Sequence, residues 1–222
     1  NEGLPPMPAP MPMQAAGDVV SLFSDAYTDE PLDFINGFWE FSTTQSRKVA
    51  VQGDSMIEYT QLNFVGIQFT NPTIDVSQMN HLHLDIWTPD QTAAADFKVL
   101  LRDFGPNGVF DENGDDTFHE LIFISPTLQT GSWVSFDIPL SNFAGLTGRS
   151  NLAQLVLSTS ENGLSTVFVD NVYFYAGDPG GGGDGAARAG PEPGVQHAAP
   201  VEGHGRDHLG RLQRVHADGD PS

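Results

Sequence analysis

Apolar and polar side chains alternate along much of the chain between residues 18 and 175. The run 81–87 has three aliphatic side chains on one face of an extended strand and four polar or aromatic ones on the other: Leu82, Leu84 and Ile86 opposite His81, His83, Asp85 and Trp87. The run 97–102 divides in the same way: Phe97, Val99 and Leu101 opposite Lys98, Leu100 and Arg102. A period of two is the pattern of a β-strand with one buried face.

Further β-rich runs predict more strands at 18–27, 63–69, 118–124, 131–140, 151–160 and 165–175. Pro, Gly, Asn and Ser separate these runs, as expected of turns. No stretch has a convincing apolar stripe of 3.6-residue period, although 151–158 is ambiguous. Eight to ten short strands with frequent turns predict an all-β fold, an antiparallel β-sandwich of the jelly-roll kind, as a single domain with flexible termini.

The aromatic residues define the domain boundaries. All 15 Phe, 4 Tyr and 3 Trp lie between Phe23 and Tyr175. Residues 1–17 are rich in proline, which predicts an extended linker that acts as a semi-rigid spacer. Residues 176–222 form a Gly- and Pro-rich linker and tail without a core-forming side chain, predicted to be disordered. The abrupt change in composition there leaves two interpretations open, an ordinary flexible tail and a frameshift or cloning scar. The predicted domain is therefore 18–175.

Charge and cysteine content exclude several classes of protein. The chain carries 29 acidic and 9 basic residues, of which 21 and 5 fall within 18–175, a balance of −16. This acidity argues against binding to nucleic acid or to an anionic membrane surface, since both depend on Lys and Arg. No apolar run is long enough to span a bilayer. The absence of cysteine excludes thiolate catalysis and thiolate metal sites, so any metal must be held by oxygen or imidazole ligands.

The first candidate site is the polar face of the strand 81–87. An exposed Trp87 beside His83 and Asp85 is suited to sugar recognition, because the indole stacks on the C–H face of a pyranose while polar side chains bind the hydroxyls. Lys98 and Arg102, outward on the next predicted strand, would complete this platform. Two alternatives remain: Trp87 packs under a loop, or the histidines form a metal pair, for which no third ligand is evident.

The second candidate is the loop 103–116, in which Asp, Asn and Gly alternate. Its oxygen ligands, Asp111, Asn113 and Asp115, suit Ca²⁺, which accepts six to eight oxygens in flexible geometry. An EF-hand is excluded, because Gly114 comes one position too early and the twelfth position is Ile122. An ion-free hairpin turn explains the same composition.

The third candidate lies at the chain ends of the domain. The first and last strands of a sandwich commonly pair, which would bring Asp25 close to Asp170. Two nearby carboxylates repel each other unless one is protonated or a cation bridges them, and a structural Ca²⁺ would do so.

Several motifs together resemble the β-sandwich carbohydrate-binding modules appended to secreted bacterial endoglucanases and laminarinases. They are VVSLFSDAYTD, LHLDIWTPD, LRDFGPNGVFDENGDD, GSWVSFDIPLSNF and TVFVDNVYFY, and they cover about 18–175. The resemblance implies binding to β-glucan (cellulose, mixed-linkage or β-1,3-glucan, or xyloglucan), an associated catalytic glycoside hydrolase domain and an extracellular location. It also implies structural Ca²⁺ at Asp170 with Asp25, and structural packing for Trp133.

Trp39, in a loop or short-strand context, is the second candidate for a ligand platform, and Tyr59 is the third. Catalysis is not expected, because the paired carboxylates of jelly-roll glucanases, a G-x-S-x-G elbow and a zinc motif are all missing from the sequence. The sequence therefore predicts a non-catalytic binding module. A calcium-dependent adhesion or protein-docking module is the alternative; an apolar patch of several hundred Å² would favour it.

Overall fold

The computed structural model describes residues 3–111, 114–161 and 163–177. These residues contain ten β-strands and two 3-10 turns, Ala16–Asp18 and Leu140–Asn142. The strands are β1 (Val19–Phe23), β2 (Gln45–Val51), β3 (Asp54–Thr60), β4 (Phe64–Gln68), β5 (His81–Trp87), β6 (Asp96–Asp103), β7 (Thr117–Ile124), β8 (Val134–Pro139), β9 (Leu152–Ser158) and β10 (Val167–Tyr175).

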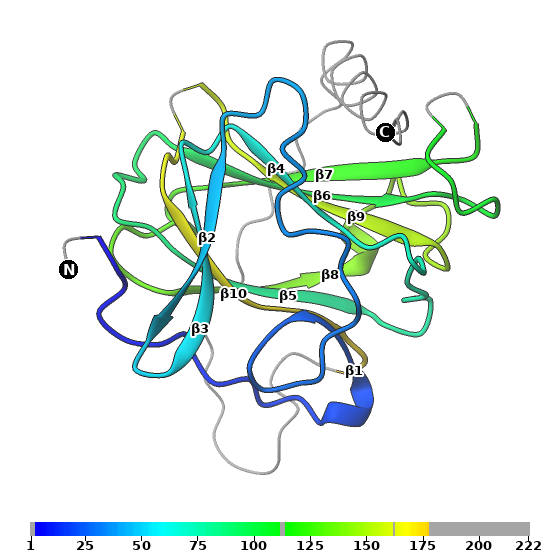
Figure 1. Ribbon diagram of the computed structural model, residues 1–222, viewed down its shortest axis with the longest axis horizontal. Helices are drawn as coiled ribbons and strands as arrows, with labels where there is room; N and C mark the ends of the chain where they lie inside the picture. The colour runs from blue at the N-terminus through cyan, green and yellow to red at the C-terminus, as the bar shows by residue number, and fades with distance from the viewer. Residues whose placement is uncertain (1–2, 112–113, 162, 178–222) are drawn as a thin grey trace, which may run out of the picture.

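The strands form two antiparallel sheets that face each other (Figure 1). Sheet A has the order β2-β3-β10-β5-β8, with β1 paired to β10, and sheet B has the order β4-β9-β6-β7. The predicted all-β sandwich is confirmed. The predicted pairing of the first and last strands is also present, in a register that begins at Val19 opposite Tyr175.

The core lies between the sheets and contains the aliphatic side chains assigned to one face by the alternation. Leu82, Leu84 and Ile86 of β5 meet Val99 and Leu101 of β6 there, all of them buried. The other faces of β5 and β6 therefore point away from each other, on opposite sides of the sandwich. This arrangement decides which candidate residues can act together.

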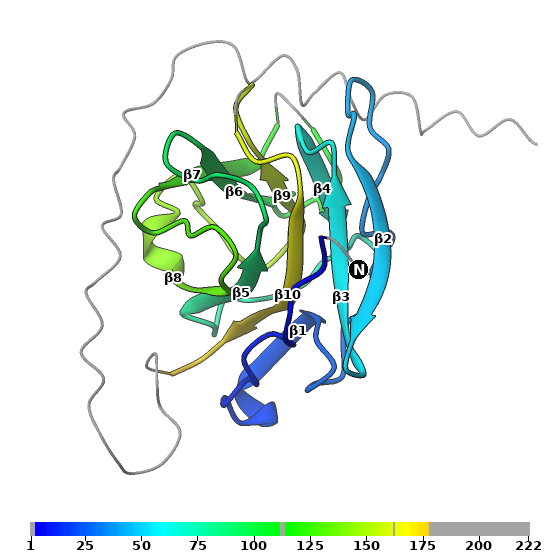
Figure 2. The same cartoon turned by 90° about the vertical axis from the view of Figure 1, so that its left-hand side faces the viewer.

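Strand β5 is buried on both faces, unlike a strand with one solvated face. The N-terminal segment crosses the outer face of sheet A before it enters β1 (Figure 2). Its described part, residues 3–17, makes hydrogen bonds to β3, to β10 and to the segment before β8. Residues 3–14 therefore pack on the domain and do not stand away from it as a spacer. The predicted disordered tail lies outside the described residues from 178 onward.

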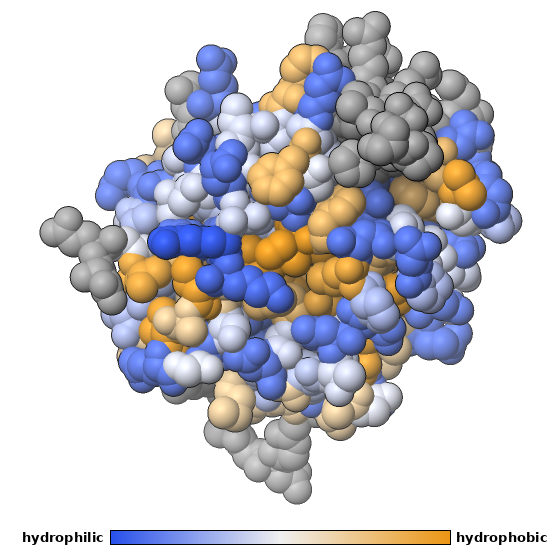
Figure 3. Space-filling view, in the orientation of Figure 1, coloured by the Kyte–Doolittle hydropathy of each residue, from blue (hydrophilic) through white to orange (hydrophobic). Residues whose placement is uncertain are grey.

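The long connection from β1 to β2 joins the two sheets. Phe34 forms a β-bridge with Gln68 at the free edge of β4, and Leu32 and Ile35 pack against the core. In the view of Figure 3, apolar side chains form a band across the middle of the face that this connection crosses in Figure 1. No helix in the described part of the chain is long and apolar enough to cross a membrane.

Candidate functional site

Trp87 is not an exposed platform. Its side chain belongs to a cluster with Met56 and Phe168 on the outer face of sheet A, and only 7% of the residue is accessible. Leu4 of the N-terminal segment and Trp133 pack against the same cluster. The prediction of a solvated face on β5 was wrong because a segment without regular secondary structure covers that face, and strand alternation carries no information about such a cover.

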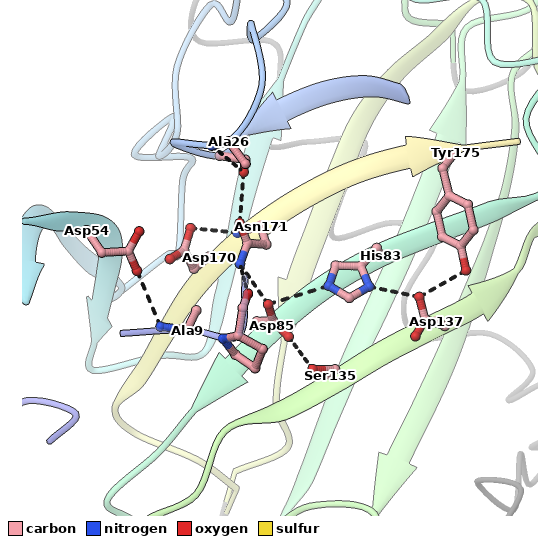
Figure 4. A network of polar contacts seen from close by, with 12 residues as sticks. Ala9, Ala26, Asp54, His83, Asp85, Ser135, Asp137, Asp170, Asn171 and Tyr175 are labelled. Carbon is pink, nitrogen blue, oxygen red and sulfur yellow. Dashed lines mark hydrogen bonds and ion pairs between the residues drawn. The ribbon is translucent and has the colours of Figure 1, made fainter. Parts of the chain in front are cut away.

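His83 and Asp85 form a buried network that links three strands of sheet A (Figure 4). The Nδ1 atom of His83 lies 2.8 Å from Oδ1 of Asp137 in β8, and its Nε2 atom lies 3.4 Å from Oδ2 of Asp85. Asn171 of β10 donates from Nδ2 to Asp85 at 2.8 Å. Burial alone would lower the pKa of His83, but hydrogen bonds and charges from Asp137 and Asp85 raise it to about 9. These residues join strands and do not form an open sugar-binding face.

Lys98 and Arg102 lie on the outer face of sheet B and so cannot extend a platform around Trp87. Strands β5 and β6 are consecutive in the chain but belong to different sheets. The Arg102 guanidinium carbon lies 5.1 Å and 4.8 Å from the ring centroids of Phe110 and Phe118, and Nη1 lies 3.8 Å from a carboxylate oxygen of Asp116. Arg102 is 5% exposed, which identifies it as a structural cation.

Trp39 also lies on sheet B. Its six-membered ring sits directly above Gly66 in the middle of β4, where a side-chain Cβ would overlap it. Phe34 packs against the indole with ring centroids 6.4 Å apart in an edge-to-face arrangement. Phe38 and Phe41, on either side of Trp39 in the sequence, have positive φ angles of 47° and 67°. Bulky residues rarely adopt this backbone, and such conformations concentrate at functional sites.

We use the name Trp39 surface for the outward side chains of sheet B next to Trp39. One cross-strand row runs from Gly66 in β4 through Val156 in β9 and Leu100 in β6 to Glu120 in β7. Val156 and Leu100 are each 3% exposed, whereas Glu120 is exposed. The row is therefore apolar from the indole to the edge strand, where it ends in a carboxylate.

Polar side chains border this row on both sides. On one side Lys98, which is half-buried, has its Nζ atom 3.8 Å from Oδ2 of Asp96. On the other side the Gln154 amide donates to Oε1 of Gln68 at 2.9 Å, which joins β9 to β4. Beyond Lys98 is a cavity of about 480 Å³, lined by Asp96, Ser160, Ile124 and the small residues 93–95. The surface combines one half-buried aromatic side chain, a buried apolar row beside it and two accessible groups of opposite charge, Lys98 and Glu120.

Tyr59 is not a ligand platform. It is fully buried in the core between the sheets, and its hydroxyl donates to the carbonyl oxygen of Ile35 at 2.7 Å. Burial raises the pKa of this hydroxyl. Trp133 is half-buried against the Trp87 cluster, and its Nε1 donates to the Met7 carbonyl at 3.0 Å.

Asp170 is fully buried at the bend of β10. Its Oδ1 accepts the backbone N–H of Asn171 at 2.6 Å, while Oδ2 has no hydrogen-bond partner in the described part of the chain. Burial, with the charges of Asp54 and Asp85, raises its pKa to about 8. Asp25 is exposed and accepts the backbone N–H of Ser55, the residue next to Asp54. Among neighbouring carboxylates, Asp54 therefore has the largest electrostatic effect on Asp170. Asp25 contacts Ser55, the next residue in the chain.

The loop 103–116 is organised by its own hydrogen bonds. Asn107 donates from Nδ2 to Asp115 at 2.6 Å, and the Asp111 backbone N–H donates to Asp116 at 3.1 Å. Asn113 lies outside the described residues, so the predicted calcium site here stays a prediction. Within 3–111, 114–161 and 163–177, no group of three or more His, Asp or Glu side chains has the geometry to hold a metal ion.

The comparisons with known proteins support the fold. No protein-family model matches the chain, and no curated protein matches it in sequence. Among solved structures, a family 30 carbohydrate-binding module matches with a TM-score of 0.54 at 19% identity, over 77% of this chain and 92% of that one. The family 30 module of a cellulosomal cellulase of Clostridium thermocellum matches with a TM-score of 0.54 at 20% identity, over 72% and 99%. The β-sandwich implied by the sequence resemblance is thereby confirmed as the fold of such modules.

The central positions of the Trp39 surface were missed in the sequence, although one signal was available. Gly66 interrupts the β-rich run 63–69, and a glycine inside a strand often marks a close approach by another group. That group is Trp39, some 27 residues earlier in the chain. Gln154 and Glu120 carried no such signal, because an outward polar residue on a strand is ordinarily just solvated.

Proposed function

We propose that this protein is a non-catalytic carbohydrate-binding module whose ligand, a β-glucan chain, lies along the Trp39 surface. The main support is the position of the Trp39 ring directly over Gly66. Gly66 lies at one end of an apolar cross-strand row. A glycine at this point lets the indole lie close to the sheet. Packing against Phe34 reduces the conformational freedom that Trp39 would lose on binding.

The chemistry of a pyranose matches this arrangement. Its axial C–H groups form an apolar face that packs on an indole and on aliphatic side chains, whereas its equatorial hydroxyls need donors and acceptors at the periphery. Val156 and Leu100, each 3% exposed, form the buried apolar row beside the indole, and the half-buried Lys98 and the exposed Glu120 are the accessible polar groups at its border. A linear chain of sugars that stacks on Trp39 would extend across sheet B toward Lys98 and Glu120, which offer partners for its hydroxyls.

The module is proposed to be secreted and to direct an associated glycoside hydrolase domain to its polysaccharide. The sequence resemblance supports this, as does the family 30 module of a cellulosomal cellulase that shares the fold. A non-catalytic role follows from the missing paired-carboxylate motif, since hydrolysis of a glycosidic bond requires two suitably spaced carboxyl groups.

The proposal is tested by titrating the folded protein with a panel of glycans and measuring heat and tryptophan fluorescence. The panel contains cello-oligosaccharides, laminarin, mixed-linkage glucan, xyloglucan and xylan. We expect saturable binding to at least one β-glucan and weaker or no binding to xylan. If the folded protein bound none of these glycans, the proposal would be wrong and a protein-docking module would become the better explanation.

We also propose a structural Ca²⁺ at the chain ends, held by the two carboxylates Asp170 and Asp54; since no third acidic side chain has ligand geometry within the described residues, its other ligands would be backbone and water oxygens. The unpartnered Oδ2 of Asp170 and its raised pKa fit a site in which a cation offsets the repulsion between buried carboxylates. Its role would be to fix β1 and β10 to the turn before β3. The loop site at Asp111, Asn113 and Asp115 is a separate proposal.

Calcium should raise the melting temperature of the metal-stripped protein. At a hundredfold excess over Kd, the stabilisation is about 2.7 kcal/mol. For a chain of this size that corresponds to roughly 5–10 °C, measured by differential scanning calorimetry. Asp170→Asn should abolish the shift, whereas Asp115→Asn, in the loop, should leave it unchanged. The chain-end site is wrong if the stripped wild-type protein shows no shift, or if only the loop variant loses it.

A further inference from the structure

The N-terminal strap, residues 4–14, crosses the outer face of sheet A without regular secondary structure and bends at Leu4, Pro6, Met7 and Gln14 (Figure 2). The described backbone–backbone hydrogen bonds include none to these residues. The strap is not an additional β-strand; side chains from sheet A and from the connections between its strands hold it. Five of its eleven residues are proline, and the chain leaves it at Ala15 with φ −67° and ψ 135°, close to polyproline II geometry.

Four side-chain donors from four different segments bind carbonyl oxygens of the strap. The contacts are Gln52 Nε2 to Pro6 at 3.5 Å, Trp133 Nε1 to Met7 at 3.0 Å, Asn171 Nδ2 to Pro10 at 2.9 Å and the Tyr27 hydroxyl to Gln14 at 2.8 Å. One acceptor, Oδ2 of Asp54, receives the N–H of Ala9 at 3.3 Å (Figure 4). The face is thus suited to a backbone that offers free carbonyls and has few N–H groups.

Polyproline backbones have this character. Proline has no N–H, its carbonyls point outward to solvent, and its fixed φ leaves little conformational entropy to lose on docking. Domains that bind such peptides use aromatic side chains, whose polar hydrogens bind the carbonyls while their rings pack on the prolines. Trp133 and Tyr27 each donate their polar hydrogen to a strap carbonyl.

The apolar contacts select one side of the strap. Pro5 is buried, and Leu4 packs on the cluster of Met56, Trp87 and Phe168. The methionines point the other way, since Met7, Met11 and Met13 are 62%, 85% and 70% exposed. Among the other prolines, Pro8 and Pro12 are partly buried, whereas Pro6 and Pro10 are exposed. Recognition therefore falls on Pro5, Pro8, Pro12 and the carbonyls, and the methionines are free to vary.

We infer that the outer face of sheet A is a binding site for a proline-rich extended peptide, and that residues 4–14 of this chain occupy it. The site is distinct from the Trp39 surface, which lies on the opposite sheet. A peptide of the same sequence therefore binds in trans only when the strap is absent. A tethered occupant has an effective concentration in the millimolar range and excludes a free competitor.

The test uses the domain without residues 1–14 and a synthetic peptide that spans residues 3–14. We expect saturable binding to the truncated domain by calorimetry, with a change in tryptophan emission. Binding to the full chain should be at least tenfold weaker. A control peptide with serine in place of all five prolines should bind at least tenfold more weakly than the native peptide. The inference is overturned if the folded truncated domain binds neither peptide, or binds both equally.

A second measurement applies if the truncated domain does not fold. In the full chain, Trp133→Phe removes the indole donor to Met7 and keeps most of the ring, and Trp39→Phe on the other sheet is the matched control. Amide hydrogen exchange at Ala9 should be at least tenfold faster in Trp133→Phe and unchanged in Trp39→Phe. Equal exchange in wild type and both variants would show that the indole does not hold the strap, and would overturn the inference.

Discussion

Replacing Trp39 by alanine should weaken β-glucan binding by roughly 30-fold or more, because an aromatic side chain that anchors an interface typically contributes about 2 kcal/mol or more. The melting temperature should change little, since Trp39 is only half-buried and lies outside the core between the sheets. Affinity for the best glycan of the panel is measured by calorimetry, with circular dichroism to confirm the fold.

Gly66→Ala provides an independent version of this test. The added methyl group would overlap the indole and force it away from β4, while Trp39 itself is kept. Binding should weaken by about the same factor as for Trp39→Ala. Trp133→Ala is the control, because it removes a half-buried tryptophan from the opposite sheet. The Trp39 surface is not the ligand site if Trp133→Ala loses affinity while both sheet B variants retain it.

The β-rich runs correctly predicted eight of the ten strands, and the alternation in β5 and β6 predicted their core-facing sides; β2 and β3 were not predicted. Leu82 and Leu84 of β5, like Val99 and Leu101 of β6, point inward as the period of two required. Alternation is a local property and does not say to which sheet a strand belongs. The two strands lie in different sheets, so Lys98 was wrongly combined with Trp87 into one surface.

The alternation also could not predict what covers the outward face of β5. Trp87 is covered because a proline-rich segment more than 70 residues away packs on it, and composition alone suggested that this segment was a spacer. Tyr59 falls on the inner face of β3, whose period was not recognised in the sequence. Trp39 was identified as a candidate from its loop context. The fold shows in addition that its ring lies against sheet B, at the point where Gly66 has no side chain.

The stability of the protein should fall steeply between about pH 6.5 and pH 9 because of His83. Its pKa is raised to about 9 in the folded state, from about 6.5 in an unfolded chain. The folded state therefore binds the proton more tightly. The resulting stabilisation is about 3 kcal/mol. It is complete below pH 6.5, the pKa of His83 in the unfolded chain, and is lost as the pH rises through about 9, its pKa in the folded state.

The groups that face His83 all belong to sheet A. Asp85 and Asp137 provide negative charge at its two ring nitrogens, and the ring of Tyr173 stacks on the imidazole with centroids 4.6 Å apart. Asp170 also has a raised pKa, which lowers stability as pH rises from about 4 to 8. The experiment is therefore performed in the Asp170→Asn background, where this carboxyl no longer titrates.

In that background, thermal melts from pH 6 to pH 9.5 should show the melting temperature falling by roughly 6–12 °C, at about 2–4 °C for each kcal/mol. His83→Gln should be less stable at pH 6 but should have a much flatter profile. Asp137→Asn removes the partner at Nδ1, so the midpoint of the fall should move to lower pH. An unchanged slope in His83→Gln would assign the pH dependence to other groups. A midpoint unmoved by Asp137→Asn would show that this carboxylate does not hold the proton on His83.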